Sequence, residues 1–206
     1  SDMHPLLNIA VRAARRAGDL IVRNLDRGPN LEVSAKSRND FVSEVDRAAE
    51  AEIIAIIRKS YPRHAFLAEE SGRTDGEECT WIIDPLDGTT NFLHGFPQFA
   101  VSIACEYRGR LEVAVVFDPM RSELFTAARG EGTQLDGKRV RVSKRRGLEG
   151  ALIGTGFPYR ANLKYLKPYL GMLEVVMGAA AGVRRPGSAA LDLAYVAAGR
   201  TDGFWE

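Results

Sequence analysis

The spacing of apolar residues changes twice along the chain, and this change restricts the folds that the sequence can adopt. In residues 4–25 apolar side chains recur at the three- and four-residue intervals of a helix that buries one face. A second helix is predicted from about residue 43 to residue 60, where Ser43 and Asp46 have the spacing of a capping box. Between the two helices, residues 31–40 are polar and predict an exposed strand or loop.

The central part of the chain has the pattern of strands instead. Alternating and β-branched apolar residues, separated by turn residues, predict an antiparallel meander. The predicted strands are 65–70, 81–84, 99–107, 111–118, 122–128, 133–135 and 138–143. Helix and strand patterns then alternate, with strands at 151–157 and from 201, helices at 161–178 and 188–199, and a basic turn at 183–187. We therefore expect a mixed α/β (α+β) fold with an N-terminal α+β lobe over residues 3–147 and a C-terminal α/β lobe over residues 148–206.

Composition gives no overall electrostatic argument for several classes of partner. The 206 residues carry a formal net charge of +1, so nothing in the overall charge favours nucleic acid, a membrane surface or a polyanion. The two cysteines are distant in sequence and form no metal or disulfide motif, which favours a reducing cytoplasm. There is no apolar run of the roughly 18 residues that a membrane span needs.

The segment WIIDPLDGTT, residues 81–90, places Asp84 and Asp87 directly after an apolar strand. Asp-Pro and Asp-Gly favour turns, which accounts for one aspartate but less well for two. Like charges held close together need a counter-ion or a proton. Carboxylates without neighbouring histidine or cysteine suit a hard cation, so the pattern favours Mg²⁺.

Two neighbouring features extend this hypothesis to phosphate chemistry. Glu69 and Glu70 end the preceding predicted strand and could reach the same edge of the sheet. Gly88, Thr89 and Thr90 place free backbone N–H groups at a predicted helix start, where phosphate binds readily. Together these residues predict phosphoester hydrolysis.

Two other enzyme classes share parts of this pattern. Phosphatases with an aspartate nucleophile use Asp-x-Asp-Gly-Thr after a strand, and the present motif has one extra residue. A spacing of three would then need a turn to bring both side chains together. A metal site of the glycosyltransferase type is conceivable, but it leaves the glutamate pair without a use.

Three segments resemble the inositol monophosphatase family of Mg²⁺-dependent, lithium-sensitive phosphatases. They are EESG at 69–72, WIIDPLDGTTNF at 81–92 and GSAALDLAYVAAGRTDGFWE at 187–206. The resemblance implies the layered α-β-α-β-α sandwich of inositol monophosphatase and fructose-1,6-bisphosphatase, a homodimer, and hydrolysis of myo-inositol 1-phosphate by metal-activated water.

The resemblance also assigns roles to individual residues. It implies Mg²⁺ ligands at Glu69, Asp84, Asp87 and the backbone carbonyl of Leu86. It implies activation of the attacking water by Glu69 and Thr89, with Asp46 orienting the threonine. The substrate-binding residues that it implies are Asp84, Leu86, Asp87, Gly88, Thr89, Gly187, Ser188, Ala189 and Glu206.

The chain departs from the family pattern at its end. The sequence stops at Glu206, where the family continues to a further aspartate ligand. The C-terminal lobe is therefore expected to be truncated, and if the later segment is absent from the protein a second metal should bind weakly.

Substrate and partner stay open at this level. Related phosphatases with the same motif act on fructose bisphosphate or phosphoadenosine phosphate, and glycerol phosphates or nucleotides are not excluded. Some members of the family are implicated in ribosomal RNA transcription antitermination and processing, which makes an RNA polymerase or antitermination complex an alternative partner. The basic segment 138–146 could serve such a role, although a strand edge protected by charge explains it as well.

Overall fold

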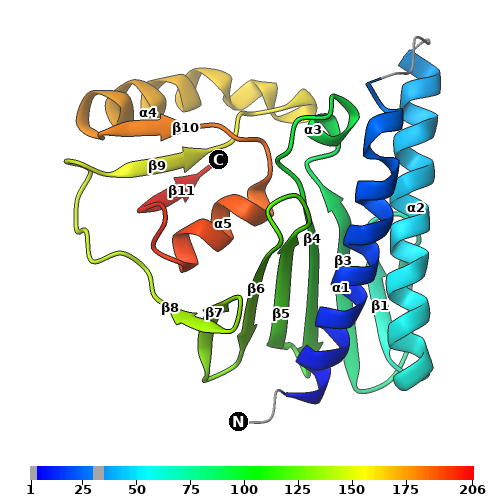
Figure 1. Cartoon of the computed structure of the whole chain (residues 1–206). Helices are drawn as coiled ribbons and strands as arrows, with labels where there is room; N and C mark the ends of the chain where they lie inside the picture. The colour runs from blue at the N-terminus through cyan, green and yellow to red at the C-terminus, as the bar shows by residue number, and fades with distance from the viewer. Residues whose placement is uncertain (1–3, 30–34) are drawn as a thin grey trace.

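The computed structural model of the protein describes residues 4–29 and 35–206, and Figure 1 shows their arrangement. The helices are α1 Pro5–Asn24, η1 Leu25–Arg27, α2 Ala35–Ser60, α3 Thr89–Leu93, η2 Arg160–Tyr165, α4 Leu166–Ala179 and α5 Ala189–Ala197. The strands are β1 Ala65–Ala68, β2 Gly72–Thr74, β3 Cys79–Asp87, β4 Ala100–Tyr107, β5 Arg110–Asp118, β6 Glu123–Ala128, β7 Gly132–Leu135, β8 Lys138–Val140, β9 Leu152–Thr155, β10 Gly182–Arg184 and β11 Gly203–Trp205.

A large sheet in the order β2-β1-β3-β4-β5-β6-β7-β8 forms the centre of the structure. All neighbouring strands run antiparallel except β1 and β3, which are parallel. The predicted meander is thus correct from β3 onward, whereas the short edge strand β2 was missed. The basic strand β8 lies at the opposite edge, where its charges disfavour pairing with another sheet.

Helices α1 and α2 pack side by side over one face of this sheet (Figure 1). The alanines of α1 make this packing close, since Ala10, Ala13 and Ala17 are fully buried. Pro5 starts the helix, where its missing N–H costs nothing, and His4 Nδ1 accepts a hydrogen bond of 3.2 Å from the Leu6 N–H.

Helix α2 begins at Ala35, about eight residues before the predicted start. Residues 35–40 are therefore helical rather than a strand or loop, and residues 31–34 of that prediction lie outside the described residues. The predicted capping box is wrong, because Ser43 and Asp46 lie inside α2. The additional turns are stabilised by tertiary packing, since Phe41 is buried and stacks on Phe92 with ring centroids 5.9 Å apart.

A second, parallel sheet in the order β10-β9-β11 lies beyond α5 (Figure 1). Helix α5 is placed between the two sheets, with Leu191 and Ala194 packed against the large sheet, and α4 covers the outer side of the small one. The result is a five-layer α-β-α-β-α arrangement, as expected. Part of the predicted basic turn is instead strand β10.

The proposed boundary near residue 147 falls between β8 and β9, and the division into two lobes stays a prediction. Within residues 4–29 and 35–206, every helix is too short or too polar to cross a membrane.

Candidate active site

The end of strand β3 carries both aspartates of the central motif. Asp84 pairs with Ser102 and Asp87 with Ala100, so β3 has two residues between these pairs where β4 has only one. This is a β-bulge rather than the predicted turn, and it includes Pro85, which has no N–H to give to a ladder. Because the bulge adds one residue, the odd spacing of three returns Asp87 to the same side of the strand as Asp84.

Glu69 lies beside Asp84 because β1 and β3 run parallel. The Glu69 N–H donates to the Ile83 carbonyl at 3.3 Å, and the two carboxyl side chains share a hydrogen bond. Burial, with a smaller contribution from Glu69 and Asp87, raises the pKa of Asp84 to about 8. Asp84 Oδ1 also accepts the Leu86 N–H at 3.2 Å. The structure therefore brings Glu69, Asp84 and Asp87 to one strand end.

Helix α2 contributes two buried carboxylates to the same region. Burial raises the pKa of Asp46 to about 7, assisted by Glu70 and Glu69. Glu50, which the sequence reasoning missed, accepts the backbone N–H groups of Glu70 at 2.8 Å and Ser71 at 2.9 Å. Glu50 follows Asp46 by one helical turn on the apolar face of α2, and a carboxylate on an apolar helix face could have been recognised from the sequence as a candidate site residue. The pairing of Asp46 with Thr89 stays a prediction.

Gly88 connects β3 to α3 in a left-handed conformation with φ of 100°. A Cβ at this position would lie 2.8 Å from the Gln98 carbonyl oxygen, so both conformation and space favour glycine. Thr89 is the first residue of α3, which agrees with the predicted helix start. The Gly88 and Thr89 backbone is thus held directly after Asp87.

The C-terminal half reaches this site through the segment 187–190. Ser188 Oγ donates to Asp87 Oδ2 at 2.6 Å, and the Ala190 N–H donates to the same oxygen at 2.9 Å. Ser188 is buried, Gly187 has φ of 97°, and Ala189 begins α5. These predicted substrate residues therefore lie against Asp87, although they are about 100 positions away in sequence.

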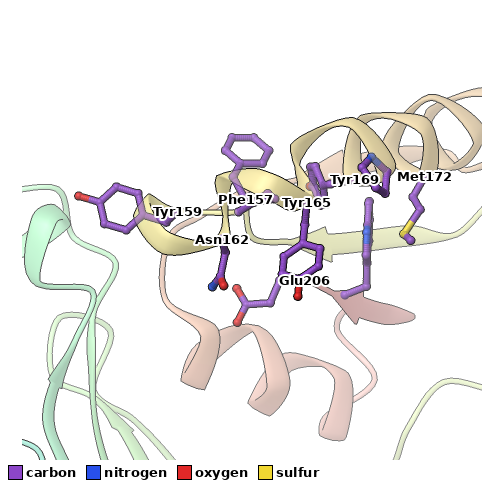
Figure 2. A pocket seen from close by; sticks show the side chains of 10 residues that line it. Phe157, Tyr159, Asn162, Tyr165, Tyr169, Met172 and Glu206 are labelled. Carbon is purple, nitrogen blue, oxygen red and sulfur yellow. The ribbon is translucent and has the colours of Figure 1, made fainter.

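Glu206 lines a cavity of about 590 Å³ whose other walls are mainly aromatic (Figure 2). Asp192, which the sequence reasoning did not assign, connects this carboxylate to the strand end. Burial raises the pKa of Asp192 to about 7, followed by repulsion from Asp87 and then Glu206. A series of carboxylates thus extends from the β3 end toward the cavity.

The donor atoms of this region suit a hard cation. Glu69, Asp84 and Asp87 offer carboxylate oxygens, and the pKa of Asp84 is raised mainly by burial and then by the neighbouring Glu69 and Asp87 carboxylates. Within residues 4–29 and 35–206, no three or more His, Cys, Asp or Glu side chains are already grouped as a metal site. One reason is visible at Asp87, whose Oδ2 is turned toward Ser188 and Ala190. The residues fit Mg²⁺ by donor type, and binding would draw them closer together.

Comparison with known proteins agrees with the fold. The five-layer structure is that of solved inositol monophosphatases, including the enzyme from Anabaena sp. PCC 7120, with TM-score 0.84 and 40% identity over 98% of this chain and 74% of that one. The model of the inositol monophosphatase family matches residues 2–206, and the chain belongs to this family.

Two other relatives are more similar in sequence. The Nus factor SuhB of Pseudomonas aeruginosa is 58% identical over 99% of this chain and 77% of its own length. The crystal structure of the extragenic suppressor protein suhB from Bartonella henselae has TM-score 0.90 and 50% identity over 98% of this chain and 78% of that one.

Proposed function

We propose that the protein is a Mg²⁺-dependent phosphomonoesterase that hydrolyses myo-inositol 1-phosphate to inositol and phosphate. The observation that carries this proposal is the convergence of Glu69, Asp84 and Asp87 at the end of β3, directly before the Gly88 and Thr89 backbone. Membership of the inositol monophosphatase family supports the same reaction class.

Glu69, Asp84, Asp87 and the Leu86 carbonyl would hold Mg²⁺. When bound, Mg²⁺ supplies a lowered pKa for coordinated water and compensation for the negative charge of the phosphate. Repulsion from the Glu69 and Asp87 carboxylates adds to the larger effect of burial in raising the pKa of Asp84.

The remaining residues bind substrate and move protons. The Gly88 and Thr89 N–H groups would bind phosphate oxygens. The Thr89 hydroxyl and Glu69 would accept the proton of the attacking water, with Asp46 orienting the threonine. The polyol would be bound by Gly187, Ser188, Ala189 and Glu206. The first three belong to the segment that contacts Asp87, and Glu206 lines the cavity and lies close enough to Asp192 to raise its pKa.

The decisive experiment measures phosphate release from myo-inositol 1-phosphate with and without Mg²⁺. We expect release that depends on Mg²⁺ in the native protein and is lost in Asp84→Asn. Asp75→Asn is the matched control, because Asp75 is exposed and pairs only with the exposed Arg73 among the described residues. Native-like release from Asp84→Asn, or no release by the folded protein with Mg²⁺, would refute the proposal.

A second function is favoured by the name of the relatives that are 57–58% identical, Nus factor SuhB. We propose that the protein also binds the transcription machinery in ribosomal RNA antitermination, independently of catalysis. Binding to purified transcription complexes should then survive Asp84→Asn. Absence of binding at low salt by the native protein would contradict it.

Three further properties are proposals, two of them suggested by the family resemblance and the third by the separation of the two cysteines. We propose a homodimer, inhibition of the phosphatase by lithium, and a cytoplasmic location. Sedimentation, a lithium titration of phosphate release and cell fractionation would test them respectively.

A further inference from the structure

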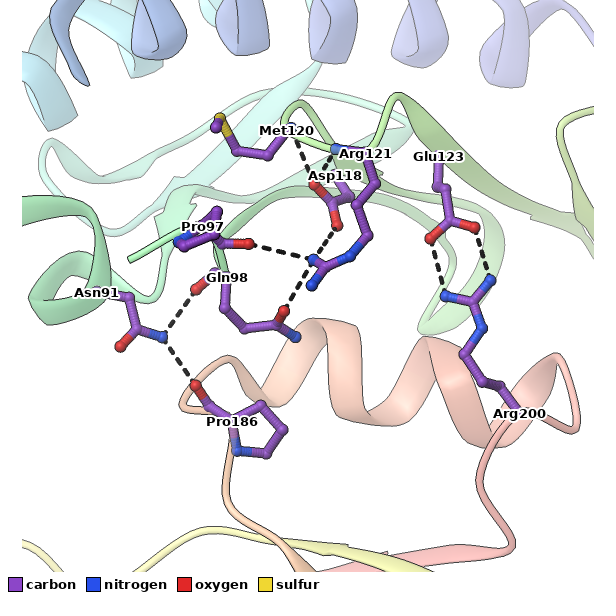
Figure 3. Close-up of polar contacts among 9 residues, drawn as sticks. All are labelled: Asn91, Pro97, Gln98, Asp118, Met120, Arg121, Glu123, Pro186 and Arg200. Atoms are coloured by element: carbon purple, nitrogen blue, oxygen red, sulfur yellow. Dashed lines mark hydrogen bonds and ion pairs between the residues drawn. The ribbon is translucent and has the colours of Figure 1, made fainter. Parts of the chain in front are cut away.

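One amide group connects the two halves of the candidate site. Asn91, in helix α3, directs its Nδ2 toward two backbone carbonyls, at 2.8 Å from Gln98 O and 2.9 Å from Pro186 O (Figure 3). Both partners are carbonyl acceptors, so Asn91 must present the NH₂ group of its amide to them and not the amide oxygen. The second bond spans 95 positions in sequence and connects the helix after Gly88 to the segment that leads into α5.

The Gln98 side of this connection is itself fixed. Arg121 Nη1 donates to Gln98 Oε1 at 2.8 Å and to the Pro97 carbonyl at 3.2 Å (Figure 3). The same nitrogen donates to Asp118 Oδ2 at 3.0 Å, and Asp118 is fully buried. Charge-assisted bonds to a buried carboxylate hold the guanidinium, and through it Gln98, in one place. Asn91 therefore connects the segment at Pro186 to a rigid anchor.

The Pro186 side leads directly to a proposed metal ligand. Gly187 follows with φ of 97°, and a Cβ there would come within 2.8 Å of Asn91 Nδ2, so the segment passes close against the amide. Ser188 Oγ and the Ala190 N–H then bind Asp87 Oδ2. A shift at Pro186 would move both of these donors, because only one residue separates Pro186 from Ser188.

We propose that Asn91 is a positioning residue that holds the segment 186–190 against Asp87 and thereby sets the orientation of this carboxylate for a divalent cation. The proposal rests on the proposed function for its biological meaning. Asn91 touches neither the substrate nor the cation in this scheme and acts through Pro186, Ser188 and Asp87.

The test uses Asn91→Asp, which keeps the shape but places a carboxylate against two carbonyl oxygens. The matched control is Asn24→Asp, because the Asn24 amide likewise donates to a backbone carbonyl, that of Leu20, but within α1 and without contact to the segment 186–190 among the hydrogen bonds of the described residues. Amide hydrogen exchange at Ala190 and Mn²⁺ binding followed by electron paramagnetic resonance are measured for both variants. Neither measurement requires activity.

We expect at least tenfold faster exchange at Ala190 and at least tenfold weaker Mn²⁺ binding in Asn91→Asp, with both values native in Asn24→Asp. Phosphate release by Asn91→Asp should recover at high Mg²⁺ while circular dichroism shows that the variant is already folded without Mg²⁺, which separates weaker cation binding from loss of stability. If Asn91→Asp does not fold, the same measurements are made on Asn91→Ala. This variant removes the donor without adding charge.

Native exchange at Ala190, or faster exchange with unchanged Mn²⁺ affinity, would overturn the proposal. Failure of the proposed function would look different. The native protein would then release no phosphate, while the exchange and Mn²⁺ measurements would still decide the role of Asn91.

Discussion

The large and the small sheet differ in how completely they are covered. Helices pack on both faces of each sheet, but the core of the large sheet contains fully buried large side chains such as Trp81, Phe66 and Phe92. On the small sheet, α4 buries only Tyr169, whereas Val175 and Met177 are 67% and 63% exposed. The proposed metal ligands come from the well-covered sheet, and the proposed polyol-binding residues come from the half with fewer buried side chains.

The difference between the two sheets suits a division between the proposed metal site, which lies on the large sheet, and the proposed substrate-contacting residues, which lie in the other half. Metal ligands need closely defined positions, which a packed core provides. Substrate-contacting residues can vary between related enzymes without disturbing the metal site. Substitutions on the two sides of this division should therefore differ in their effects, and the largest effect is expected in the core of the large sheet.

Trp81→Ala in β3 should lower the free energy of unfolding by about 3–5 kcal/mol, because it leaves a large cavity. It also leaves His64 Nδ1 without the Trp81 Nε1 donor, at 3.0 Å in the native structure. Met177→Ala on α4 should change stability by no more than about 0.5 kcal/mol. Denaturant titration measures both, and equal effects would abolish the distinction between the two sheets.

Asp87→Asn should reduce phosphate release by roughly 10²–10³-fold, since it removes a charged ligand at the transition state. The protein should remain folded, because an amide oxygen can still accept from Ser188 and Ala190. Steady-state kinetics together with circular dichroism would separate loss of chemistry from loss of structure. A native rate would remove Asp87 from the metal site.

Glu206→Gln should raise KM for myo-inositol 1-phosphate by about 10–100-fold, the range expected for a lost charge-assisted hydrogen bond, with a smaller change in kcat. The substitution keeps the side-chain shape in the aromatic cavity. An equal fall in kcat with unchanged KM would place Glu206 in the chemical step instead.

Arg200→Ala should cost about 1 kcal/mol or less, because the pair with Glu123 is partly exposed. Arg200 donates two hydrogen bonds to Glu123, at 2.8 and 2.6 Å, and connects the segment after α5 to β6 (Figure 3).

The Arg200 guanidinium lowers the pKa of Glu123 below its ordinary value near 4.5. The native protein should therefore lose this contribution as the pH falls below about 4.5, and Arg200→Ala should lose less. Parallel acid denaturation curves for the two proteins would contradict this.

Local signals predicted much of the fold. The apolar stripe of α1 and the alternating residues of β4 and β5 are buried as their spacing indicates. The early start of α2 was missed because residues 35–40 are polar, and it is the packing of Phe41 on Phe92 that favours helix there. Propensity at such a position yields to a contact about 50 residues away in sequence.

The candidate site was predictable to the extent that its residues cluster in short motifs. Glu69, Asp84, Asp87 and Gly88 lie within 20 positions of one another and meet at one strand end. Asp192 and Asn91 were missed as site residues because their importance depends on partners from distant segments. Spacing alone does not report such contacts.

The bulge in β3 has a consequence for how phosphatase motifs relate to one another. In a regular ladder, two aspartates share a side only when an even number of positions separates them. The extra residue around Pro85 changes this parity locally, so an odd spacing places both carboxylates on the same side of the strand. Deleting one residue between Asp84 and Asp87 and restoring the ladder would give Asp-x-Asp, the spacing of the phosphatases that use an aspartate nucleophile. The length of the motif therefore reflects strand pairing, because the bulge absorbs one additional residue and keeps both carboxylates on one side of β3.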